Sequence, residues 1–94
     1  MEQFGDTACA LPPFDTEVAQ NVLRKLRIWK LLEGARGGER ADISSLTHCL
    51  ARFSELVDDL ADSLISLEIN PLVVRPGSGG VAALDAVIEL AQQA

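Results

Sequence analysis

Apolar residues recur every three or four positions over two stretches of the chain, which predicts two amphipathic helices. The first predicted helix covers residues 15–33, with Asp15 or Thr16 as its N-cap and Gly34 as the residue that ends it. Its apolar stripe consists of Val18, Val22, Leu26, Trp29 and Leu32.

The second predicted helix begins after Asp42, a good N-cap residue. Its apolar stripe consists of Ile43, Leu46, Leu50, Phe53, Val57 and Leu60, widened by Cys49 and Leu56. The residues predicted to face solvent are Thr47, Ser54, Asp58 and Asp62. This long periodic stretch therefore predicts a helix that packs one face against the rest of the domain.

After the second helix, apolar residues alternate with polar ones, which predicts a strand over residues 64–70. Pro71 interrupts that strand, and an extended run resumes over residues 72–75. The glycine-rich residues 76–80 predict a hairpin loop, followed by a second arm over 81–87 and a terminal helical turn over 88–94. Residues 7–11, closed by two prolines, predict an edge strand. The predicted fold class is α+β: one domain over residues 1–94, with two helices on a small antiparallel sheet in the order β-α-α-β-β.

Composition and charge narrow the classes of function. A chain of 94 residues with 48% hydrophobic residues predicts a globular domain, part of whose surface meets another domain or subunit. The net charge of −6 disfavours nucleic acid and anionic membranes as partners. A basic cluster, Arg24, Lys25, Arg27 and Lys30, is interpreted as solvated surface or a docking face.

The sequence also bears on location and on metal chemistry. No apolar run approaches the ~20 residues that span a bilayer, and no signal peptide is recognisable, so we expect a cytoplasmic protein. Cys9 and Cys49 have no spacing typical of a metal site.

Three polar residues of the predicted hairpin are candidates for chemistry. Glu68 and Asn70 project from the same face of a strand because they are two residues apart. If the loop is Gly77–Gly80, Leu72 pairs with Asp85, and the Asp85 side chain joins that face. If the loop is Pro76–Gly80, the Asp85 side chain turns to the opposite face. Oxygen donors of this kind suit Mg²⁺. From spacing alone, an ordinary solvated face remains the alternative.

Short motifs in a definite order resemble a known family. The sequences LEINPLVV (residues 67–74) and ALDA (83–86), separated by the glycine turn, resemble the closing hairpin of the ATP-grasp domain. The similarity is to acyl-CoA synthetases that form ADP or GDP, including the succinyl-CoA synthetase β subunit and ADP-forming acetyl-CoA synthetases. The sequences LLEGARG (31–37), Asp42 and LARFS (50–54) resemble the preceding helix–loop–helix. The resemblance covers Ala8 to Leu90.

The resemblance implies a role for each hairpin residue. Asn70 and Asp85 match the residues that hold the Mg²⁺ accompanying ATP/ADP or GTP/GDP. Glu68 matches a catalytic acidic residue beside them, where the phosphohistidine loop approaches. Arg36 in its glycine-flanked loop is interpreted either as a contact to a nucleotide phosphate or as a tie to an acidic partner helix.

The resemblance also implies that other parts are needed. The glycine-rich loop and the nucleotide-contacting lysine belong to an N-terminal lobe that would precede Met1, and the phosphohistidine belongs to a CoA-binding domain or subunit. His48 does not match that histidine. We therefore expect this chain to be part of an acyl-CoA synthetase that is inactive alone. The alternative is a non-catalytic ATP-grasp-derived module with an assembly or regulatory role.

Overall fold

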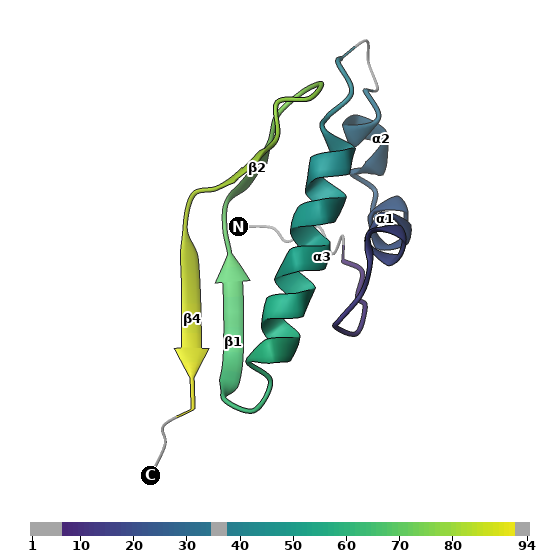
Figure 1. Ribbon diagram of the computed structural model, residues 1–94. Coiled ribbons are helices and arrows are strands. Elements are labelled where there is room, and N and C mark those ends of the chain that lie inside the picture. The colour runs from purple at the N-terminus through teal and green to yellow at the C-terminus, as the bar shows by residue number, and fades with distance from the viewer. Residues whose placement is uncertain (1–6, 35–37, 92–94) are drawn as a thin grey trace.

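The computed structural model describes residues 7–34 and 38–91 and confirms the α+β class (Figure 1). Its helices are α1 (Thr16–Arg24), α2 (Trp29–Leu32) and α3 (Ile43–Asp59). Its strands are β1 (Leu64–Ile69), β2 (Leu72–Val74), β3 (Val81–Ala83) and β4 (Ala86–Leu90). The predicted edge strand over residues 7–11 is wrong, because these residues form no strand.

The first predicted helix is divided into two. Asp15 caps α1 as predicted, its Oδ1 accepting a hydrogen bond of 2.9 Å from the Val18 N–H. The amides of Lys25 and Leu26 then bond to carbonyls three residues back instead of four, which tightens the backbone and ends α1. Gly34 ends the helical region with a φ of +96°, as expected for a C-terminal glycine. The break allows the Arg24 guanidinium to lie 5.9 Å from the centre of the Trp29 ring.

The face that α1 buries against α3 differs from the predicted stripe by about one position. Ala19 and Leu23 are the buried residues of α1, whereas Val18 from the predicted stripe is 38% exposed. Small Ala19 permits close approach to α3, so the most buried position is not occupied by the largest side chain.

Helix α3 begins after Asp42 as predicted, but two of its predicted solvent-facing residues are buried. Ser54 is only 2% exposed; its Oγ donates to the Ala51 carbonyl and accepts from the Phe14 amide at 3.0 Å. Buried Thr47 donates to the Ser44 carbonyl at 2.9 Å. Both hydroxyls are satisfied by backbone groups, which removes most of the cost of burying them. The assignment of these two residues to the wet side is therefore wrong.

The strands form one long hairpin in two sections. β1 pairs antiparallel with β4, placing Ile69 opposite Ala86, and β2 pairs antiparallel with β3, placing Leu72 opposite Ala83. The hairpin closes where the Gly79 amide donates to the Pro76 carbonyl at 3.1 Å. The register therefore matches neither predicted loop, since Leu72 pairs two residues short of Asp85.

The end of β4 corrects a second prediction. Residues 88–90 were predicted to start a helical turn, but they continue β4 and pair with β1. The backbone of β1 offers these residues hydrogen-bond partners that local sequence does not reveal. Residues 92–94 lie outside the described part of the chain.

The hairpin lies along α3 and is held at both ends (Figure 1). At its base, the Ala91 amide donates to the Ser63 carbonyl at 2.7 Å, directly after the turn that follows α3. At its tip, the Gly77 amide donates to the Arg40 carbonyl at 2.8 Å, just before α3 begins. Among the described residues, no helix has the length and apolar character to cross a membrane.

Candidate functional site

Asn70 and Asp85 lie opposite each other where the two sections of the hairpin meet. The Asn70 amide donates to the Asp85 carbonyl, and the Leu84 amide donates to the Pro71 carbonyl, both at 3.1 Å. Pro71 has no N–H to offer, which interrupts the ladder at this point. Side chains of directly opposed residues share a face, with Cβ atoms typically about 4.5–5.5 Å apart. Asn70 and Asp85 both lie just outside the strands, so the backbone bond joins the two residues across the hairpin, and a shared face for their side chains stays a prediction.

Glu68 lies near this pair along the chain. It is two residues before Asn70, and its partner across the ladder is Val87. Two residues of strand span about 7 Å, which is the approximate separation of the Glu68 and Asn70 backbones along the hairpin. All three side chains are exposed, so they are accessible to a ligand or a second protein segment.

The donors of this pair fit Mg²⁺. The Asp85 Oδ1 accepts a hydrogen bond of 2.9 Å from the Ala86 amide, which orients the carboxylate. A carboxylate and an amide carbonyl are hard oxygen donors, and Mg²⁺ commonly takes one or two protein oxygens together with water and phosphate oxygens. Within the described residues, no group of three or more His, Cys, Asp or Glu side chains is placed to hold a metal. The pair therefore suits an ion that arrives with a phosphate ligand.

Two other residues were considered in the sequence, Arg36 as a candidate contact and His48 as a histidine that does not match the phosphohistidine. Arg36 lies outside the described residues, so its predicted contact to a phosphate or a partner helix stays a prediction. His48 is exposed on α3, and its Nδ1 lies 2.8 Å from the Ser44 carbonyl oxygen.

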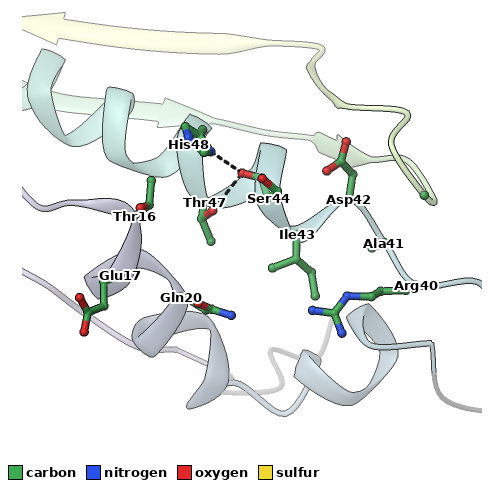
Figure 2. Close-up of a pocket in the computed structure, with 11 residues that line it drawn as sticks. Thr16, Glu17, Gln20, Arg40, Ala41, Asp42, Ile43, Ser44, Thr47 and His48 are labelled. Atoms are coloured by element: carbon green, nitrogen blue, oxygen red, sulfur yellow. Dashed lines mark hydrogen bonds between the residues drawn. The ribbon is translucent and has the colours of Figure 1, made fainter.

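A cavity of about 540 Å³ lies elsewhere, between α1 and the start of α3 (Figure 2). Its lining residues are Thr16, Glu17, Gln20, Arg40, Ala41, Asp42, Ile43, Ser44, Thr47, His48 and Gly77. The residues that line this cavity include the Glu17 carboxylate and the Arg40 guanidinium. Their opposite charges favour binding of neither a cation nor an anion. The hairpin residues Glu68, Asn70 and Asp85 do not line it. We therefore take the hairpin face, whose donors are of one chemical kind, as the candidate site.

Asp42 has a function that its N-cap position alone did not predict. Its side chain is 7% exposed and accepts three hydrogen bonds. Oδ1 accepts from the Ser45 amide at 3.0 Å, and Oδ2 accepts from the Ser45 hydroxyl and the Gly80 amide, both at 2.8 Å. The bonds from Ser45, followed by the bond from Gly80, hold the pKa of the Asp42 carboxyl below its ordinary value.

The lowered Asp42 pKa predicts how stability depends on pH. Because the folded-state pKa lies below the unfolded value of 3.8, the carboxylate stabilises the fold above pH 3.8, and this contribution is lost as the pH falls through the folded pKa. We expect Asp42→Asn to reduce the loss of stability on acidification from pH 5 to pH 3. Urea unfolding of both proteins at each pH measures the difference, and equal acid sensitivity would contradict this role.

Comparison with known proteins identifies the family of this chain. The family model described as "ATP-grasp domain" matches residues 1–90. The chain belongs to the ATP-grasp domain family. The resemblance seen in the hairpin and helix motifs is therefore confirmed.

Individual relatives of this ATP-grasp chain are ADP-forming acyl-CoA ligases. The β subunit of ADP-forming acetate–CoA ligase II from Pyrococcus furiosus is 32% identical over 90 residues, which are 96% of this chain and 38% of the relative. The ADP-forming 4-hydroxybutyrate–CoA ligase of Nitrosopumilus maritimus is also 32% identical, over 96% of this chain and 13% of the relative. The chain thus spans a minor part of the proteins it matches, and it is homologous to their ATP-grasp region.

Solved structures share the fold. A crystal structure from Pyrococcus horikoshii Ot3 has a TM-score of 0.87 and 30% identity, covering 94% of this chain and 37% of that one. A dinucleotide-forming acetyl-coenzyme A synthetase from Ca. Korarchaeum cryptofilum has a TM-score of 0.80 and 25% identity, covering 93% of this chain and 38% of that one. The latter structure contains coenzyme A, acetyl-coenzyme A and a phosphorylated phosphohistidine segment.

Proposed function

We propose that this ATP-grasp chain supplies the Mg²⁺–nucleotide ligands of a cytoplasmic ADP- or GDP-forming acyl-CoA ligase. The observation that supports the proposal is the hydrogen bond from the Asn70 amide to the Asp85 carbonyl, which joins the two residues directly across the hairpin. The reaction is the reversible exchange of acyl-CoA, phosphate and nucleoside diphosphate for acid, CoA and nucleoside triphosphate.

Each hairpin residue has a distinct task in this proposal. Asn70 and Asp85 hold Mg²⁺ through an amide and a carboxylate oxygen, and the Ala86 amide keeps the Asp85 carboxylate oriented. When bound, the ion neutralises charge on the phosphoryl oxygens during transfer. Glu68 accepts a hydrogen bond from the approaching histidine and fixes the orientation of its ring. The phosphohistidine segment in the Korarchaeum relative supports this part of the proposal.

The exposed apolar residues of the hairpin support a proposal about partners. Ile65, Leu84 and Val87 are each more than 60% exposed, and Ile88 is half exposed. Covering exposed apolar side chains of this kind with another protein surface is favourable in free energy. We propose that they pack against the rest of the ATP-grasp domain, which supplies the N-terminal nucleotide-binding lobe. A further domain or subunit then brings the CoA site and the phosphohistidine, and Arg36 contacts a phosphate.

An NMR titration of this chain with Mg²⁺-ADP tests the metal role. We expect saturable shifts of the Asn70, Asp85 and Ala86 amides at ligand concentrations up to ~1 mM, a usual range for nucleotide substrates. Asp85→Ala should abolish these shifts, because it removes the only charged ligand of the pair. Asp58→Ala, which removes an exposed carboxylate from α3, is the matched control and should leave them unchanged.

Equal shifts in wild type and Asp85→Ala would show that binding does not use the predicted ligands. Absence of binding by the wild-type chain would contradict a preformed half-site. In that case the activity of Asn70→Ala and Asp85→Ala in the proposed ligase decides between a site completed by another lobe and a non-catalytic module.

A further inference from the structure

The tip of the hairpin is joined to the start of α3 by a closed ring of hydrogen bonds. The Asp42 amide donates to the Arg75 carbonyl at 2.8 Å, the Arg75 amide donates to the Gly80 carbonyl at 3.0 Å, and the Gly80 amide donates to the Asp42 Oδ2 at 2.8 Å. Arg75 and Gly80 face each other on the two arms, one position beyond the last strand pair. Asp42 therefore contacts both arms of the hairpin at once.

Neighbouring contacts support the same junction. Ala41 forms an isolated antiparallel bridge with Pro76, and the Gly77 amide donates to the Arg40 carbonyl at 2.8 Å. Gly77 has a φ of +64°, and a Cβ atom added there would lie 2.9 Å from the Glu39 carboxylate. Glycine at this position therefore lets the tip approach the segment before α3 closely.

Capping a helix does not require this arrangement. Asp15 is the N-cap of α1, where its carboxylate accepts the Val18 amide and remains exposed. Asp42 accepts the equivalent amide, that of Ser45, with Oδ1, and thus has Oδ2 available for the hairpin. Its carboxylate is buried between helix and hairpin, where a charge-assisted hydrogen bond is stronger than in water.

We propose that Asp42 is a positioning residue, which fixes the hairpin tip on α3 and so sets where Asn70 and Asp85 present their oxygens. The inference rests on the proposed metal role of that pair. The base of the hairpin is attached through the turn after α3, and the interruption at Asn70 lies between base and tip. Gly80 is five residues from Asp85, a strand distance of about 17 Å. Without the carboxylate tether, only the backbone contacts of residues 40–42 hold the tip, so the two sections pivot more readily at the interruption of the ladder.

The test uses Asp42→Ser, which keeps an N-cap oxygen for the Ser45 amide but is too short to reach Gly80. Asp15→Ser is the matched control, because it makes the same change at an N-cap that does not contact the hairpin. Amide hydrogen exchange should accelerate about ten-fold or more at Gly80, and also at Asn70, in Asp42→Ser only, as expected for loss of a bond to a charged group. Mg²⁺-ADP affinity should fall about ten-fold in the same variant and stay unchanged in the control.

The two readouts separate this inference from the proposed function. Faster exchange at Gly80 with unchanged exchange at Asn70 would overturn the positioning role, since the tether would then act only at the tip. Loss of Mg²⁺-ADP affinity in both Ser variants would also overturn it, as a general effect of capping. If the wild-type chain binds no Mg²⁺-ADP, exchange at Asn70 alone decides whether Asp42 positions the pair. If the α3 amides lose protection from exchange in Asp42→Ser, then Asp42→Asn replaces that variant in every comparison. Asp42→Asn keeps the cap but offers Gly80 no charged acceptor.

Discussion

Replacing Asp85 with alanine in the acyl-CoA ligase proposed for this chain is expected to lower kcat for acyl-CoA formation by about 10²–10³-fold. A metal ion in phosphoryl transfer contributes several kcal/mol of charge stabilisation, and each ~1.4 kcal/mol corresponds to ten-fold in rate. Asp85 is the only charged member of the proposed pair, and its carboxylate is held in place by the Ala86 amide. A steady-state assay of CoA-thioester formation at saturating Mg²⁺ measures the effect.

Two companion variants make that result specific. Asn70→Ala should lower kcat in the same direction but less, because it removes a neutral oxygen. Asp58→Ala removes an exposed carboxylate of α3 that lies outside the hairpin and should behave as wild type. Wild-type activity in both Asn70→Ala and Asp85→Ala would eliminate the metal role and favour a non-catalytic assembly or regulatory module.

Replacing Leu46 with alanine is expected to destabilise the chain by about 2–4 kcal/mol, the range for deleting a buried leucine side chain. Leu46 is 5% exposed and lies on the face of α3 that packs against the rest of the domain. The stability of small domains is itself only about 5 kcal/mol or somewhat more, so a substantial unfolded population should appear. Urea unfolding followed by circular dichroism measures the change in the free energy of unfolding.

Leu56→Ala is the matched control for that measurement. It makes the same substitution in the same helix at a side chain that is 45% exposed, so the expected loss is clearly smaller, about half as large by buried area. Similar losses for the two variants would contradict a special contribution from burial of Leu46, because helix propensity favours alanine equally at both positions.

Several features of this fold follow from local sequence. Asp15 and Asp42 were predicted as N-caps, and each accepts the amide three residues on. Gly34 was predicted to end the first helical region and does so with a positive φ. These features depend on a few consecutive residues, whose side chains reach only their own backbone, so sequence alone determines them. The hairpin motif and its family resemblance were likewise visible without coordinates.

The pairing of the hairpin needed the tertiary structure. The glycine-rich segment allows several loops, and the observed register, which places Asn70 opposite Asp85, matched neither of the two considered. The segment's composition alone does not select one loop, so contacts outside the loop contribute to the choice. Here the contacts that Asp42 and Arg40 make with the tip favour the observed turn.

Burial was also decided by distant parts of the chain. Ser54 reads as a solvent-facing residue by helical period, yet it is buried because Phe14, forty residues earlier, supplies a hydrogen bond. Residues 88–90 carry no clear strand signal, and they are extended because β1 offers them a ladder. Sequence by itself therefore determined the starts of α1 and α3, the α+β class and the candidate residues Glu68, Asn70 and Asp85. Tertiary structure alone decided the hairpin register, the buried face of α3 and the second role of Asp42, because each depends on a partner that is close in space and remote along the chain.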